Sequence, residues 1–213
     1  MLGVYSLDIL LENIGRRFNR EWVFKAINYR FLQGNSYAIL GPNGSGKSTL
    51  LQVLLGSLTS SEGKITYWSE KGEVDVNDFF LSTSLAAPYQ ELIEDFTLRE
   101  LIDFHFSFKR MEDGMTTRLL IELIELERAA DKELRYFSSG MRQRTKLALA
   151  CCAQTPTLFL DEPTTNLDVK GVAWYLNLIE RFTKNKLLII GSNQEHEYSF
   201  CQHHIHIEHY KAR

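Results

Sequence analysis

A run of glycine, lysine and serine residues is the strongest chemical signal in the chain. Residues 41–48 read Gly-Pro-Asn-Gly-Ser-Gly-Lys-Ser and fit the Walker A pattern G-x-x-x-x-G-K-[ST]. Glycines allow the backbone to wrap closely around phosphate groups, so that successive N–H groups point inward. The run also follows a predicted strand and opens a predicted helix, which is the context the pattern requires. We therefore expect a phosphate-binding loop here.

The residues of this loop have distinct expected roles. The helix that starts near Lys47 adds its positive dipole end, and the Lys47 side chain brings a mobile charge to the β- and γ-phosphates. The Ser48 hydroxyl can ligate Mg²⁺, a hard cation that prefers oxygen. The residues expected to contact nucleotide in this loop are Gly41, Pro42, Asn43, Gly44, Ser45, Gly46, Lys47, Ser48 and Thr49.

A second chemical signal lies at residues 157–162. They read Thr-Leu-Phe-Leu-Asp-Glu, a short apolar strand that ends in two acids, which is a Walker B pattern. Asp161 would hold Mg²⁺, directly or through water, and Glu162 would polarise the attacking water as the general base. Standing alone, this segment would be read as a strand that ends in a charged turn. Together with the phosphate loop it predicts a site of nucleotide hydrolysis.

The predicted elements alternate between strands and helices. Predicted strands cover residues 7–13, 23–32, 35–40, 64–68, 78–82, 158–161 and 187–191. Predicted helices cover residues 48–55, 139–153 and 169–182, with two more between 98 and 126 that Asp113-Gly114 separates. Buried strands alternating with helices indicate an α/β fold with a mainly parallel sheet. Ligands in such sheets bind at the carboxyl ends of the strands.

The composition is that of an ordinary globular domain. Of 213 residues, 44% are hydrophobic and 24% charged, which argues against intrinsic disorder. The net charge of −3 gives no reason to expect nucleic acid as a partner. The longest run of small and apolar residues, 147–153, is far too short to cross a bilayer, and no secretory signal is visible. The three cysteines, Cys151, Cys152 and Cys201, are expected to be buried free thiols.

Two further segments resemble one protein family. Residues 137–144 read FSSGMRQR and resemble the LSGGQ signature of ATP-binding cassette (ABC) proteins. Residues 161–168 read DEPTTNLD and look like the Walker B and D-loop run of the same family. The signature follows the predicted helical insertion and precedes the Walker B strand, as in that family. The resemblance covers nearly the whole chain.

The resemblance implies a single ABC ATPase domain with a P-loop NTPase core. That core would comprise residues 1–96 and 138–213, with an antiparallel β-subdomain at its N-terminal side and a helical subdomain inserted at residues 97–137. Two such cassettes sandwich two ATP molecules, with Mg²⁺, and each signature faces the γ-phosphate held by the other cassette. Because capping and phosphate binding use the same N–H groups, an ordinary serine N-cap is compatible with this role. The signature residues assigned to that contact are Ser138, Ser139, Gly140 and Met141.

Family members also stack an aromatic residue on adenine, in the turn between the first two strands. Its spacing to Ile27-Asn28 makes Phe18 the expected platform, with Trp22 as the second candidate. Stacking requires only a π-face. The alternative is an aromatic residue that merely packs in the turn.

Two positions depart from the family pattern. The loop glutamine that would reach the metal-bound water and meet the membrane partner aligns with Pro88, whereas Gln90 is displaced by two residues. The histidine that would contact the γ-phosphate aligns with Asn193, whose amide donates a hydrogen bond but carries no proton or charge. His196 could take its place only if the loop bends differently. The resemblance therefore implies ATP hydrolysis with Glu162, Lys47 and Asn193 as catalytic residues, and a reduced rate.

Five of the six histidines lie between His196 and His209. His204 and His206 would share one face of a strand. Solvated histidines at a sheet edge are the simpler interpretation, and a metal site is the alternative.

The expected function is that of the ATP-binding and ATP-hydrolysing subunit of an ABC transporter. Its expected partners are ATP, a second ABC subunit and a separate transmembrane permease. The permease would place the chain on the cytoplasmic face of the membrane and would choose the cargo. One alternative is a soluble ABC protein of translation or DNA repair, and another is a weakly hydrolysing interaction module. A small-molecule kinase is disfavoured because such enzymes lack the signature at residues 138–140.

Overall fold

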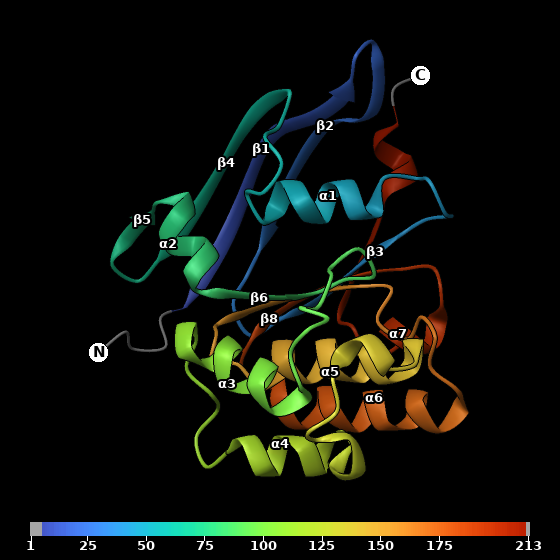
Figure 1. Cartoon of the computed structure of the whole chain (residues 1–213). Coiled ribbons are helices and arrows are strands. Elements are labelled where there is room, and N and C mark those ends of the chain that lie inside the picture. The colour runs from blue at the N-terminus through green and yellow to red at the C-terminus, as the bar shows by residue number, and fades with distance from the viewer. Residues whose placement is uncertain (1–5, 212–213) are drawn as a thin grey trace.

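The computed structural model describes residues 6–211 and shows two β-sheets with helices around them (Figure 1). The antiparallel sheet has the order β2-β1-β4-β5, formed by β1 (Leu7–Phe18), β2 (Glu21–Phe31), β4 (Glu62–Ser69) and β5 (Gly72–Val74). The parallel sheet has the order β6-β7-β8-β3-β9, formed by β3 (Ser36–Leu40), β6 (Thr83–Ala86), β7 (Thr157–Asp161), β8 (Leu187–Ser192) and β9 (His203–His206). The predicted α/β fold, with a mainly parallel sheet and an antiparallel N-terminal sheet, is confirmed.

Helices cover both faces of the parallel sheet. In Figure 1, α1 (Lys47–Leu54) lies between the two sheets, whereas α5 (Ser139–Cys151) and α6 (Val169–Phe182) cover the opposite face. Successive side chains of strand β7 point to opposite faces of the sheet. Phe159 packs in the core beside α1, whereas Leu158 and Leu160 pack in the core beside α5 and α6. With both faces covered, β7 is buried along its whole length.

The remaining helices are short or belong to the middle of the chain. They are α2 (Val76–Leu81), α3 (Leu98–Phe108), α4 (Thr117–Leu123), α7 (Glu195–Tyr198) and three 3₁₀ segments, η1 (Glu127–Ala129), η2 (Leu134–Tyr136) and η3 (Ile207–Tyr210). Leu98 and Ile102 of α3 pack with Leu149 of α5, which joins the helical segment to the sheet-covering helix. A capping box between Thr97 and Glu100 starts α3.

The predicted strand at residues 78–82 is wrong, because α2 occupies this segment and the strand β6 starts only at Thr83. The Asp75 carboxylate accepts the Asn77 N–H at 2.9 Å and caps the helix. Phe79 then stacks on Tyr67 with ring centroids 3.9 Å apart, while the two apolar residues after it remain exposed. An apolar run of this length does not separate a strand from a short helix.

The first strand is longer than its apolar pattern predicts. It continues to Phe18 and turns at Asn19, whose φ is +54°, into β2. Irregular register between Leu11 and Arg17 interrupts the alternation that marks a strand in the sequence. The predicted free, buried cysteines are confirmed, and burial raises the pKa of Cys151 to about 12.

Candidate functional site

The two phosphate-chemistry motifs meet at the carboxyl ends of adjacent strands. The loop at residues 41–48 follows β3, Asp161 ends β7, and Asn193 follows β8. Strand register places Leu40 opposite Ser192 and Asp161 opposite Gly191. The parallel sheet therefore brings together segments that lie more than 100 residues apart in the chain.

The phosphate loop wraps around its own lysine. The buried Lys47 Nζ donates to the Gly41 carbonyl at 2.9 Å and to the Pro42 carbonyl at 3.2 Å. Gly46, with φ of +108°, lies so close to β2 that an added Cβ would meet Val23 Cγ1 at 2.4 Å. No side chain caps the N-terminus of α1, so the helix presents uncapped N–H groups at this loop.

Asp161 is a buried carboxylate without a hydrogen-bond partner. Both of its oxygens are buried and unpaired within residues 6–211. Burial raises the pKa of Asp161 to about 6, and the nearby Ser48 hydroxyl partly opposes that rise without meeting hydrogen-bond geometry. A pair of unsatisfied carboxylate oxygens beside a serine hydroxyl fits a hard divalent cation such as Mg²⁺.

Glu162 follows Asp161 in an uncommon backbone conformation. Its φ is +43°, and its N–H donates to the Gly191 carbonyl at 2.8 Å, which holds the turn against β8. The Glu162 carboxylate is partly exposed and lies 3.9 Å from Lys47 Nζ. The two predicted catalytic side chains are therefore in contact range.

The loop after β8 brings Asn193 to the phosphate loop. Asn193 Nδ2 donates to Asn43 Oδ1 at 2.8 Å. His196, the other candidate for this position, instead has its Nε2 2.9 Å from the Thr164 hydroxyl. The role of Asn193 at the γ-phosphate stays a prediction, and this contact supports it.

The signature begins α5 as a capped helix terminus. Ser138 Oγ accepts the Met141 N–H at 3.2 Å. Gln143 Nε2 of the same helix donates to the Pro163 carbonyl at 2.7 Å, which ties the signature helix to the segment after Glu162. A hollow of about 470 Å³ opens beside the signature, and its lining includes Ser138, Ser139, Gly140, Met141, Asn166, Leu167 and Asp168.

The adenine platform stays a prediction. Phe18 ends β1 with 48% of its surface exposed, and the Arg16 guanidinium lies 4.5 Å from its ring centroid. Trp22 packs beside Gly15 and Glu62, with Lys25 Nζ 4.8 Å from its ring. Both candidates thus have a cation near the ring, and the exposed position of Phe18 at the end of β1 supports its choice as the platform.

The loop after β6 contains Gln90, which the sequence places two positions from the expected glutamine, and Tyr89, which no motif in the sequence singles out. Gln90 Oε1 turns back to accept the Ala87 N–H at 2.9 Å. Strand register sets Ala86 opposite Leu160, so the chain leaves β6 level with Asp161. Burial raises the pKa of Tyr89, the polar Gln52 side chain partly opposes that rise, and the Asp161 charge adds to it. The sequence could have indicated that Gln52 faces the same side of α1 as Ser48, because the two residues lie one helical turn apart.

The C-terminal histidines do not gather into a cluster. His203 stacks on Tyr37 with ring centroids 4.8 Å apart, and the rings of His206 and His209 are 5.4 Å apart. Between residues 6 and 211, no group of three or more His, Cys, Asp or Glu side chains is arranged to hold a metal ion. Over the same range, none of the helices has the length and apolar character needed to cross a membrane.

Known proteins of one family are similar to this chain. The ABC transporter family model matches residues 24–165. The sulfate/thiosulfate import ATP-binding protein of Mesostigma viride is 30% identical over 198 residues, covering 89% of this chain and 56% of that protein. The Nod factor export ATP-binding protein I of Burkholderia lata is 33% identical over 160 residues, covering 74% of this chain and 53% of that protein. The chain thus spans little more than half the length of these two relatives.

Solved structures share the fold at lower identity. A putative ABC transporter ATP-binding protein from Pyrococcus furiosus has a TM-score of 0.80 at 20% identity, covering 96% of this chain and 100% of that one. A dimeric ATP-binding cassette in a post-hydrolysis state, bound to ADP and Pi, has a TM-score of 0.76 at 20% identity, covering 93% and 94%. On the match of the family model to most of its length, the chain belongs to the ABC transporter family.

Proposed function

We propose that this chain binds and hydrolyses ATP as the nucleotide-binding subunit of an ABC transporter. The observation that carries the proposal is the buried, unpaired carboxylate of Asp161, which lies at the phosphate loop beside Ser48. An unpaired buried carboxylate is costly to maintain, and a bound cation with nucleotide relieves that cost.

The chain's own residues would perform the binding step. Lys47 Nζ would exchange its two loop carbonyls for phosphate oxygens, and the free N–H groups at the start of α1 would donate to the same phosphates. Ser48 and Asp161 would hold Mg²⁺, which when bound neutralises charge on the phosphate oxygens.

Glu162 would act as the general base. Its carboxylate is partly exposed and lies 3.9 Å from Lys47 Nζ, at the edge where the γ-phosphate would lie. When Lys47 turns to the phosphates, the carboxylate is free to accept a hydrogen bond from the attacking water. Asn193, which reaches the loop at Asn43, would donate its amide hydrogen to the γ-phosphate.

A second cassette would complete the site. The hollow beside Ser138 to Met141 opens at a helix N-terminus, where an anion is favoured. In the proposed dimer this hollow would take the γ-phosphate held by the partner cassette.

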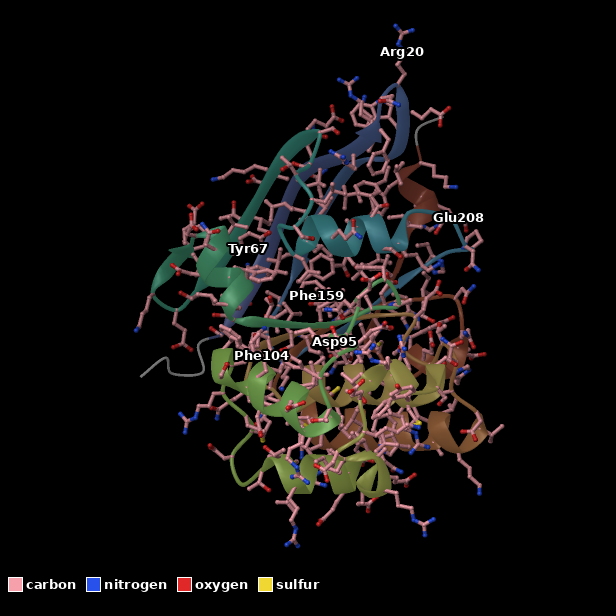
Figure 2. The ribbon with its side chains drawn as sticks, in the orientation of Figure 1. Arg20, Tyr67, Asp95, Phe104, Phe159 and Glu208 are labelled. Atoms are coloured by element: carbon pink, nitrogen blue, oxygen red, sulfur yellow. The ribbon has the colours of Figure 1, made fainter. Side chains whose placement is uncertain are left out.

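The permease would contact an apolar surface formed by α2, α3 and the loop between β6 and α3. Phe80, Leu81, Phe104 and Phe108 expose large parts of their side chains there, and Phe104 is labelled in Figure 2. A groove of about 230 Å³ is lined by Phe104 and Phe108 of α3, with Leu85, Ile93 and Leu101 also among its lining residues. Large exposed apolar groups that share one region mark a protein contact. Binding there would hold the chain on the cytoplasmic face of the membrane.

The proposal is tested with the purified chain, MgATP and a phosphate-release assay. We expect saturable phosphate release together with an ATP-dependent increase in particle mass by light scattering. MgATP binding without any phosphate release would contradict the hydrolytic part and favour a weakly hydrolysing interaction module, which Asn193 and the inward-turned Gln90 support. Some relatives are named as import proteins and others as export proteins, so the proposal names neither the cargo nor the direction of transport.

Restoring histidine at Asn193 should accelerate the reaction. Asn193→His is expected to raise kcat by about tenfold, because an imidazole beside the γ-phosphate would recover about 1.4 kcal/mol of transition-state stabilisation. The apparent KM should change less, since the gain lies mainly in the transition state. Steady-state phosphate release at saturating MgATP measures the effect.

His196→Ala is the matched comparison for that experiment. Because His196 faces Thr164, we expect its removal to change turnover little. A neutral Asn193→His with a strongly impaired His196→Ala would reverse the assignment. If neither substitution changes kcat, the loop after β8 does not contact the reacting phosphate.

Tyr89 should take part in hydrolysis more than Gln90. Tyr89→Phe is expected to lower kcat by about 2- to 10-fold, the range for one lost hydrogen bond, with little change in nucleotide affinity. Single-turnover phosphate release measures it. A Gln90→Ala variant that is more impaired than Tyr89→Phe would assign the role to the displaced glutamine instead.

A further inference from the structure

Glu197 is a fully buried acid for which the proposed mechanism has no role. It lies in the short helix α7 with a relative exposure of 0%. No ion pair with a lysine, arginine or histidine neutralises it anywhere in residues 6–211. A buried carboxylate without a cation needs several hydrogen-bond donors to remain stable.

Three donors surround the Glu197 carboxylate, and they come from the turn after β7 and from the last residue of β8. Its Oε1 accepts the Thr164 N–H at 2.7 Å and the Thr164 hydroxyl at 2.5 Å. Its Oε2 accepts the Ser192 hydroxyl in a short hydrogen bond. Thr164 lies two residues after Glu162, and Ser192 immediately precedes Asn193.

Both hydroxyls have Glu197 as their nearest acceptor. Ser192 Oγ accepts the Gln194 N–H at 2.9 Å, and of the two acceptors within reach of its hydrogen the Glu197 carboxylate is much nearer than the Gln194 carbonyl at 3.4 Å. The Thr164 hydroxyl donates to Glu197 Oε1 at 2.5 Å, which leaves its oxygen as the acceptor toward His196 Nε2, 2.9 Å away. All three partners then donate, which is the arrangement that an ionised carboxylate requires.

The Glu197 backbone is held as well. The buried Tyr175 hydroxyl of α6 donates to the Glu197 carbonyl at 3.0 Å. The Glu162 N–H donates to Gly191 on β8, and the Thr165 N–H closes the turn by donating to the Glu162 carbonyl at 3.1 Å. The carboxylate therefore lies at a junction between the turn that carries Glu162 and the strand end that leads to Asn193.

We propose that Glu197 is a positioning residue for ATP hydrolysis, because its buried carboxylate fastens the Glu162 turn to the β8 end and sets both side chains relative to the phosphate loop. The expected change in kcat rests on the proposed function. The expected coupling between the Glu162 turn and the end of β8 does not depend on that function.

The experiment uses the full chain with Glu197→Gln, Thr164→Val and, as a matched control, Glu195→Gln on the exposed side of the same helix. Glutamine keeps the shape and still accepts from Thr164, but presents an NH₂ to Ser192. Thr164→Val removes the hydroxyl that donates to Glu197 and keeps the hydrogen bond from the residue 164 N–H to the same carboxylate. We expect kcat to fall by about 10- to 100-fold in Thr164→Val and Glu197→Gln, since small misplacements of a catalytic group cost this much.

The affinity for MgADP should stay within about threefold of wild type, because Lys47 and the phosphate loop are not part of the junction. Wild-type kcat in both variants would overturn the proposal. A parallel loss of affinity and thermal stability would reduce Glu197 to a purely structural residue and would also overturn it. Glu195→Gln should match wild type throughout.

Hydrogen exchange separates this proposal from the proposed function. We expect peptides covering residues 160–168 and 188–196 to exchange faster together in Glu197→Gln, while peptides from the antiparallel sheet remain unchanged. If the wild-type chain does not hydrolyse ATP, the proposed function fails, and this coupled change still tests the junction. Unchanged exchange in both peptides would overturn it.

Discussion

Glu162→Gln should stop turnover while leaving ATP binding intact, and an ATP-bound dimer should accumulate. Glutamine keeps the size of the side chain at a position where the backbone φ is +43° and its N–H is bound to Gly191, so the turn is preserved. The lost proton acceptor should lower kcat by about 10²- to 10⁴-fold, the usual contribution of a general base. Phosphate release measures turnover, and light scattering with ATP measures the dimer.

Glu180→Gln is the control for that variant, because Glu180 is an exposed acid on α6 away from the strand ends. It should hydrolyse ATP and disassemble as wild type does. Wild-type phosphate release by Glu162→Gln would remove this residue from the mechanism.

Lys47→Ala should abolish tight MgATP binding with little effect on folding. The side chain is the only cation within the residues of the phosphate loop, and its loss should weaken binding by at least about 100-fold, or about 2.7 kcal/mol. Calorimetric titration with MgATP gives the affinity, and thermal unfolding without nucleotide gives the stability.

Lys64→Ala, which removes an exposed lysine of β4, is the matched control. Unchanged MgATP affinity in Lys47→Ala would count decisively against the loop as the nucleotide site. A collapse of thermal stability would show instead that the contacts of Lys47 with the Gly41 and Pro42 carbonyls hold the loop together.

The elements with a strong local signal could be predicted from the sequence. Helix α6 lies at the predicted residues 169–182, because Asp168 caps it and accepts the Gly171 N–H at 2.7 Å. The positions of the phosphate loop after β3 and of Asp161 at the end of β7 could also be predicted, because each motif occurs at a strand end. By contrast, the sequence predicts a strand where α2 lies, because an apolar run this short shows neither the helical nor the strand period.

The parts of the site that depend on tertiary contacts could not be predicted. Tyr89 lies near Asp161 only because β6 pairs with β7 in one register. Glu197 follows a histidine and a glutamate in a polar stretch, and nothing in that stretch shows that it is the one acid enclosed by Thr164 and Ser192. The bond between Thr164 and Glu197 joins residues 33 positions apart and leaves no periodic trace in the sequence.

The strand order of the parallel sheet also determines when the phosphate loop can form during protein synthesis. Strand β3, which leads into the loop, has β8 and β9 as its two neighbours, and both come from residues after 186. A nascent chain that has emerged only as far as α6 therefore holds a complete Walker A sequence on a strand with no partner on either side. Because non-local pairing must wait for the later segments, β3 is paired on both sides only after residue 206 has left the ribosome, however early the glycines and the lysine emerge.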